Sequence, residues 1–133
     1  MGSRLNPHMF FMTSAVDALD FYRGVFGGTV SITTFADRGI VDTPDTDKVM
    51  HGRLETPAGF TLTCSDTPAG LAHEPGRNVA IALDGDDADD LRRWFAGLAS
   101  GGQVVVPLEV SAGEEYGQLV DRFGIVWLVT VTT

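Results

Sequence analysis

Two histidines, each in a strand-like segment, are the side chains of this sequence best suited to bind a metal or move protons. His8 opens an apolar run, and His51 lies in the middle of a second candidate strand. Side chains alternate along a strand, so His51, Arg53 and Glu55 share one face with Val49. Because that face is polar, it borders either a wet cavity or bulk water. A non-standard divalent metal site formed by His8, His51 and Glu55 is one hypothesis, and histidines on a solvated sheet face are the alternative.

Other side chains near these segments suggest a pocket for an apolar or planar ligand. His8, Phe10 and Met12 share one face of the first candidate strand. Ordinary core packing is the competing explanation, and it is slightly favoured for Met12. Tyr116, at the start of the last candidate hairpin, could aim its hydroxyl at a ligand or be a half-exposed strand residue. Cys64 has no histidine or basic residue beside it, so a small buried apolar role is expected rather than a reactive thiolate.

The composition indicates one globular protein and excludes several classes of partner. The chain has 133 residues, of which 44% are hydrophobic, and 18 acidic against 9 basic residues give a net charge of −9. A nucleic-acid or anionic-membrane surface requires a basic stripe, and the sequence shows none. No apolar run has the length of a membrane span, and the N-terminus lacks a signal-peptide core. With Cys64 as the single cysteine, no internal disulfide can form, so we expect a cytoplasmic protein.

The elements that must position these side chains follow one order twice. The first half predicts a strand over 5–12, a helix from an N-cap at Ser14 to a stop at Gly27-Gly28, and strands over 29–35, 49–55 and 60–65. The second half predicts a strand over 78–83, a helix capped by Asp86 and ended by Gly101-Gly102, a strand over 103–110 and a closing hairpin over 115–132. We therefore expect an α+β fold with two βαβββ modules, module 1 over about 5–66 and module 2 over about 78–133, joined by a linker over 67–77.

Several segments spread over nearly the whole chain carry a family resemblance. They are Asn6-Pro-His-Met-Phe-Phe, Ala18-Leu-Asp-Phe-Tyr-Arg-Gly-Val-Phe-Gly27, Lys48-Val-Met-His51, Leu62-Thr-Cys-Ser-Asp66, Leu98-Ala-Ser-Gly-Gly102 and Tyr116-Gly-Gln-Leu-Val-Asp-Arg-Phe-Gly-Ile-Val-Trp127. In these segments and in its paired modules, the chain resembles the PhnB-like branch of the vicinal oxygen chelate superfamily, which has the glyoxalase/bleomycin-resistance/dioxygenase fold. The resemblance implies curved mixed sheets around a concave small-molecule pocket, and a homodimer.

The resemblance also implies where a metal would bind. Metal-dependent members take a His from the first strand of each module and an acidic residue four positions after the turn glycine of the closing hairpin. The corresponding positions here are His8, about Asn78, and Leu128, so the standard metal site is expected to be absent. Trp127, one position before Leu128, is expected to point away from the pocket and pack in the core. PhnB-like proteins often carry a demethylubiquinone methyltransferase label. Methyl transfer is not expected here, because the sequence shows no glycine-rich strand-to-helix turn that would bind a nucleotide-like cofactor.

We therefore expect a PhnB-like protein that binds an unknown small molecule without a cofactor. The residues expected to line its pocket are His8, Phe10, His51, Arg53, Tyr116 and Leu128. A metal-dependent lyase or dioxygenase relative that uses His8 and His51 is one alternative, and a structural or interaction module is another. Binding proteins and enzymes share this fold, so the sequence leaves catalysis and the catalytic residues unassigned.

Overall fold

The computed structural model describes residues 2–132 of the chain, which divides into two compact units, Met1–Glu74 and Pro75–Thr133. The boundary between the units falls inside the segment 67–77. Each unit contains a helix and a four-stranded mixed sheet, so the predicted α+β class and the paired βαβββ pattern are confirmed.

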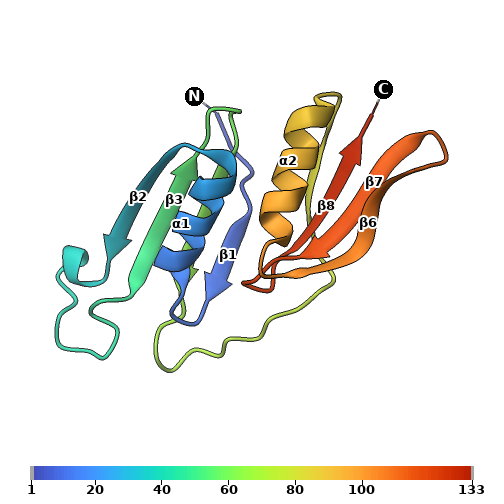
Figure 1. Ribbon diagram of the computed structural model, residues 1–133. Coiled ribbons are helices and arrows are strands. Elements are labelled where there is room, and N and C mark those ends of the chain that lie inside the picture. Colours follow the sequence, from blue (N-terminus) through green and yellow to red (C-terminus); the bar gives the residue numbers. More distant parts are fainter. Residues whose placement is uncertain (1, 133) are drawn as a thin grey trace. The chain divides into compact units, whose positions relative to one another are not determined.

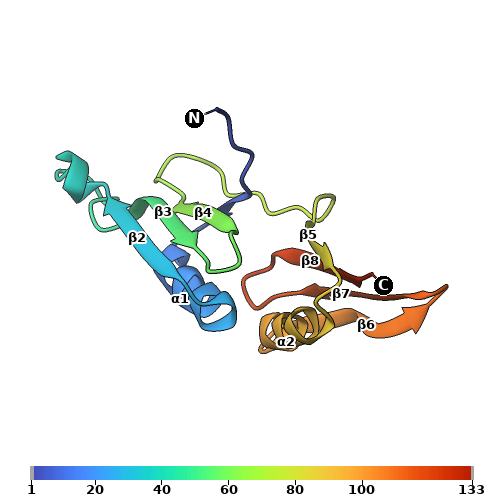
Figure 2. The same cartoon turned by 90° about the horizontal axis from the view of Figure 1, so that it is seen from above.

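The first unit consists of β1 (His8–Phe11), α1 (Ala15–Phe26), β2 (Thr29–Thr34), the short 3-10 helix η1 (Ala36–Arg38), β3 (Val49–Glu55) and β4 (Thr61–Asp66). Its sheet has the order β1-β4-β3-β2, in which β1 and β4 are parallel and the other pairs antiparallel. Helix α1 covers one face of this sheet (Figures 1 and 2). No helix of this unit, over its described residues, covers the opposite face.

Helix α1 is held to the sheet by an apolar stripe and a close approach at Gly52. The buried positions of the stripe are Ala15, Ala18, Leu19, Tyr22 and Phe26. A Cβ atom on Gly52 of β3 would lie 2.6 Å from Leu19 Cδ1, so glycine leaves the space that the leucine fills.

The start of α1 differs from the expectation that Ser14 caps it. Ser14 makes no side-chain cap hydrogen bond, and the Ala15 N–H donates instead to Asp66 Oδ1 at 3.0 Å. The cap therefore comes from β4 and joins the helix to the sheet, a long-range contact that a local capping pattern cannot show.

The second unit consists of β5 (Ile81–Gly85), α2 (Ala88–Ala99), β6 (Gln103–Ser111), β7 (Glu114–Val120) and β8 (Val126–Val131). Its sheet order, β5-β8-β7-β6, repeats that of the first unit, with β5 and β8 parallel. The expected cap at Asp86 is wrong by one residue, because Asp87 accepts the Asp90 N–H. The expected strand start at Asn78 is also wrong, because β5 begins at Ile81.

Two glycine positions show how closely the units repeat one another. Gly117 of β7 matches Gly52, since a Cβ there would lie 2.8 Å from Phe95 Cε2 of α2. At the ends of the helices, a Cβ on Gly28 or Gly102 would lie within about 2.5 Å of a backbone carbonyl oxygen, so both sites require glycine. Both units thus place the helix against the sheet through the same steric device.

The closing hairpin between β7 and β8 is built around a buried carboxylate, that of Asp121. Its Oδ1 accepts the Phe123 and Ile125 N–H groups at 2.8 and 3.1 Å, and its Oδ2 accepts Trp127 Nε1 at 2.9 Å. Gly124, with φ 87°, completes the turn and donates to the Asp121 carbonyl. Asp121 is 3% exposed and Trp127 1%, so this motif stabilises the fold, and Trp127 is a core residue as expected.

Candidate functional site

The sheet face opposite α1 carries polar side chains from three neighbouring strands. Burial alternates along β1, where Met9 and Phe11 are buried while His8 and Phe10 are exposed. Burial also alternates along most of β3, and the pairing of β4 with β1 and β3 places Thr63 and Ser65 on the same side, although both are buried. We call this surface the open face, made of His8, Phe10, His51, Arg53, Glu55, Thr63 and Ser65. Val49, expected to share this face, is instead buried at a register shift, where Thr34 pairs with Val49 and Thr33 with His51.

His8 is fixed on the open face by two hydroxyl groups of β4. Its Nδ1 lies 2.8 Å from Thr63 Oγ1 and its Nε2 3.0 Å from Ser65 Oγ. Thr63 Oγ1 donates its single proton to the Pro7 carbonyl at 3.1 Å, so it can only accept from His8. A neutral His8 therefore carries its proton on Nδ1, and its Nε2 accepts the Ser65 hydroxyl proton.

The surroundings of His8 favour its neutral form. Burial lowers its pKa from the ordinary value, and the charge of His51 lowers that pKa further. The ring centroids of His8 and His51 are 6.1 Å apart. On its other side, the Phe10 ring lies 4.8 Å from the His8 ring at an interplanar angle of 57°. The planar rings of Phe10 and His51 thus lie next to the His8 imidazole on this face.

Arg53 brings a positive charge to the same face. It pairs with Thr63 in the β3–β4 ladder, and its Nη1 contacts Glu55 Oε1 at 3.2 Å. The two side chains are 37% and 56% exposed, and ion pairs this open contribute little stability. A bound anion or carbonyl oxygen could therefore take the place of Glu55 as the partner of the guanidinium at little cost.

The residues of this face do not fit a metal centre. Both His8 nitrogens are engaged by hydroxyls, and Glu55 faces Arg53 rather than a histidine. Among the described residues, no group of three His, Cys, Asp or Glu side chains could hold a metal ion. Two hydroxyls and one imidazole are a poor donor set for a divalent transition metal.

The ladders also correct the expected counterpart of His8 in the second unit. His8 pairs with Thr63, and the equivalent pair there is Ala82 with Leu128. Asn78, the expected counterpart, precedes β5. The second unit thus places a methyl and an isobutyl group where the first has an imidazole and a hydroxyl. This pair supplies no polar ligand.

Tyr116 and Leu128 lie on the corresponding face of the second sheet. Tyr116 pairs with Thr130 and Leu128 with Gln118. The Tyr116 hydroxyl donates to Gln118 Oε1 at 3.5 Å, a long contact. Both side chains are half-buried, so each remains accessible to solvent in its own unit.

Thr63 and Ser65 are functional candidates that the sequence analysis missed. They are 6% and 8% exposed, which is unusual for hydroxyl side chains on a sheet face without a helix. The alternation in Leu62-Thr-Cys-Ser-Asp66 was the available signal, because it places both hydroxyls opposite the core residues Leu62 and Cys64. Burial raises the pKa of Cys64 to about 12, so its thiol is unreactive, as expected.

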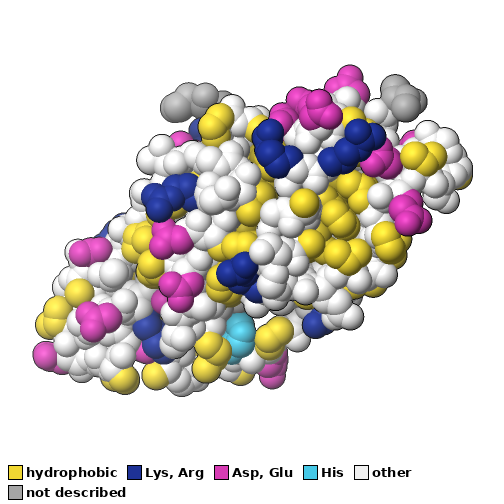
Figure 3. Space-filling model, viewed as in Figure 1, with side chains coloured by type: hydrophobic (Ala, Val, Ile, Leu, Met, Phe, Trp, Pro, Cys, Tyr) yellow, Lys and Arg dark blue, Asp and Glu magenta, His cyan; other side chains and the backbone are white. Residues whose placement is uncertain are grey.

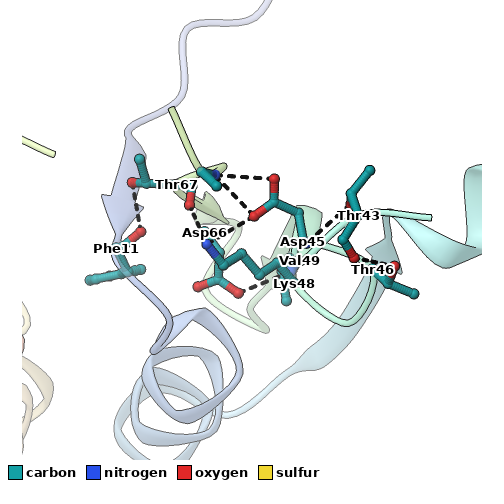
Figure 4. Close-up of polar contacts among 9 residues, drawn as sticks. Phe11, Thr43, Asp45, Thr46, Lys48, Val49, Asp66 and Thr67 are labelled. Atoms are coloured by element: carbon teal, nitrogen blue, oxygen red, sulfur yellow. Dashed lines mark hydrogen bonds and ion pairs between the residues drawn. The ribbon is translucent and has the colours of Figure 1, made fainter. Parts of the chain in front are cut away.

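A polar network holds the ends of β1, β3 and β4 together beside this face (Figure 4). Asp66 Oδ2 accepts the Val49 N–H at 2.9 Å, and the Thr67 hydroxyl donates to the Phe11 carbonyl at 2.8 Å. Lys48 Nζ donates to the Thr67 carbonyl at 2.9 Å. These bonds fix the parallel pair β1–β4 and thereby the position of His8 relative to Thr63 and Ser65.

On the side drawn in Figure 3, Lys and Arg side chains lie scattered among Asp and Glu rather than in one stripe. Over residues 2–132, neither helix is long and apolar enough to cross a bilayer.

Comparisons with known proteins place this geometry in a family. The family model described as 3-demethylubiquinone-9 3-methyltransferase matches residues 3–130. Protein PA1353 from Pseudomonas aeruginosa is 29% identical, with a TM-score of 0.83 and 98% of each chain covered. A PhnB protein from Bacillus cereus is 19% identical, with a TM-score of 0.78 over 98% of this chain and 100% of the other.

The wider fold is shared with more distant structures. A glyoxylase/bleomycin resistance protein/dioxygenase domain from Frankia sp. EAN1pec is 14% identical, with a TM-score of 0.67 over 100% of this chain and 99% of the other. At that identity the likeness concerns the fold alone. The chain therefore belongs to the 3-demethylubiquinone-9 3-methyltransferase family, and it has the fold of glyoxalase/bleomycin resistance/dioxygenase proteins.

Proposed function

We propose that this protein binds a small molecule on the open face of its first sheet and needs no metal to do so. The observation that carries the proposal is the ordered His8, held between Thr63 and Ser65 on a face that no helix of the unit covers. Thr63 and Ser65 are buried on this face, and a binding site needs a few fixed polar groups. Phe10, which is 63% exposed, adds an apolar platform beside them.

The chemistry of the face suggests what kind of molecule fits. Arg53 offers a positive charge and N–H donors, while the Ser65 proton is already donated to His8 Nε2. Phe10 and the imidazoles of His8 and His51 favour a planar group by stacking. A planar molecule that carries a carbonyl or carboxylate oxygen matches all of these groups.

A fragment screen by ¹H–¹⁵N NMR tests the proposal. Fragments that bind are expected to perturb the amides of His8, Phe10, Arg53 and the neighbouring positions of β4. His51→Ala should weaken this binding, while Asp20→Ala, on the exposed side of α1, should leave it unchanged. Perturbations confined to α1 or to the second unit would contradict the proposal.

A metal-dependent lyase or dioxygenase that uses His8 and His51 is the alternative with a direct test. Protein purified without chelators should contain no stoichiometric metal by elemental analysis. A stoichiometric metal that is lost in the His8→Ala/His51→Ala double variant would overturn the metal-free proposal.

We further propose that the protein is a cytoplasmic homodimer. The edge strand β6 supports self-association, since Val104, Val105 and Val110 are 44%, 48% and 73% exposed along it. The single, buried Cys64 suits a reducing compartment. Sedimentation equilibrium at micromolar concentration should give twice the chain mass, and a monomer at all concentrations would contradict the proposed dimer.

A further inference from the structure

The open face contains a continuous chain of hydrogen bonds that has the form of a nucleophile, a base and an orienting group. The Ser65 hydroxyl lies 3.0 Å from His8 Nε2, His8 Nδ1 lies 2.8 Å from Thr63 Oγ1, and Thr63 donates to the Pro7 carbonyl at 3.1 Å. A serine is activated when a neutral imidazole accepts its proton and a third group holds that imidazole in the right tautomer. Because Thr63 donates its proton to the Pro7 carbonyl, only the His8 tautomer with its proton on Nδ1 gives every donor an acceptor.

We propose that Ser65 is a nucleophile for acyl transfer from activated esters, with His8 as its general base and Thr63 as a positioning residue. This activity goes beyond the binding proposed above and uses the same face. Ser65 Oγ attacks the ester carbonyl carbon while its proton passes to His8 Nε2. The carbon–oxygen bond to the leaving alkoxide then breaks, and the alkoxide takes the proton from His8. Water then attacks the acyl carbon while His8 Nε2 takes its proton, the bond from that carbon to Ser65 Oγ breaks, and His8 returns the proton to Ser65 Oγ as the carboxylic acid leaves.

Neighbouring residues suit this reaction. Arg53, the ladder partner of Thr63, lies on the same face and can donate N–H groups to the developing oxyanion. Burial and the nearby His51 lower the pKa of His8, so the base is unprotonated at neutral pH. Ser65 is 8% exposed and lies on the open face, which no helix of the unit covers.

Apart from the imidazoles of His51 and His73, whose acetyl adducts hydrolyse quickly and are separated from Ser65 by the Ser65→Ala variant, the chain offers few competing nucleophiles. Cys64, next to Ser65, points to the helix side of the sheet, where a Cβ on Gly52 would lie 3.2 Å from its sulfur. Its thiol, with a pKa of about 12, does not compete. Lys48 is the only lysine in the sequence, and it is paired with Asp45 at 3.0 Å.

The test is acetylation of the intact protein by 4-nitrophenyl acetate. The release of 4-nitrophenolate gives the rate, and peptide mass spectrometry gives the acetylated residue. We expect the acetyl group on Ser65, and we expect Ser65→Ala to abolish that release. His8→Gln should slow it by about 100-fold or more. Ser31→Ala is the matched control, because Ser31 lies opposite Arg53 in β2, without a histidine partner in the structure, and should leave the rate unchanged.

The role of Thr63 is tested by a pair of conservative variants. Thr63→Ser keeps the hydroxyl and should retain most of the rate, whereas the isosteric Thr63→Val should lose it while the far-UV circular dichroism stays that of the native protein. Acetylation confined to Lys48 and the terminal amine, at a rate that Ser65→Ala leaves unchanged, would overturn the proposal. That result would leave the binding proposal intact if fragments still perturb the open face. If His8→Gln fails to fold, the acetylation map of the native protein decides the question alone.

Discussion

Replacement of Asp66 by alanine should destabilise the first unit strongly, because this carboxylate accepts two buried backbone N–H groups. Asp66 is 5% exposed, and its partners Ala15 and Val49 are 0% and 1% exposed. Each N–H group that loses its partner inside a protein costs about 1–3 kcal/mol, so Asp66→Ala should lower the free energy of unfolding by about 2–6 kcal/mol. Asp66→Asn keeps one acceptor oxygen and should lose about half as much. Many domains have only about 5–15 kcal/mol in total, so the asparagine variant is the safer measurement.

Urea unfolding followed by two probes gives the assay. Both tryptophans, Trp94 and Trp127, belong to the second unit, so their fluorescence reports that unit. Far-UV circular dichroism and amide exchange of β1, α1 and β4 report the first. Asp20→Ala is the matched control, because Asp20 is 58% exposed in its pair with Arg23 and should change the free energy by less than about 0.5 kcal/mol. An Asp66→Ala protein within that same margin of the wild type would refute the reasoning.

Three further predictions concern the core and the open face. Gly52→Ala should cost about 1–3 kcal/mol in urea unfolding, since the new methyl would lie 2.6 Å from Leu19 Cδ1. Cys64 should resist maleimide at pH 8 until the protein unfolds, because burial raises its pKa to about 12, and labelling of the native protein would contradict this. His8 should titrate below the ordinary value of 6.5 by NMR. With its pKa lowered on folding, His8 contributes stability above pH 6.5 that is lost as pH falls through its folded pKa, and His51→Ala should move that pKa upward.

Much of the fold could be predicted from local patterns. The apolar spacing of the helices and the turn around Gly124 indicated the elements to within a few residues, because both signals depend on neighbours in the sequence. The cap of α1 could not be predicted in this way. Asp66 reaches Ala15 only after β1 and β4 have paired, so the contact depends on tertiary structure.

The candidate site was predicted in outline but not in its chemistry. Alternation correctly placed His8 and Phe10 together on one face of β1 and His51, Arg53 and Glu55 on one face of β3. The hydroxyls that determine the state of His8 come from another strand, and only the parallel register of β1 with β4 brings Thr63 and Ser65 beside it. The same register changes the counterpart of His8 from Asn78 to Ala82, which the family resemblance alone could not reveal.

The tautomer of His8 is the most direct test of the account, because the binding face and the proposed activation of Ser65 both depend on it. Two-bond ¹H–¹⁵N NMR of the imidazole ring at about pH 7.5, above the ordinary histidine pKa, distinguishes the two nitrogens. The structure predicts a neutral ring with its proton on Nδ1 and a Nε2 that accepts a hydrogen bond, and Thr63→Val should disturb that pattern. A ring protonated on Nε2, or one averaging freely between the tautomers, would contradict the account.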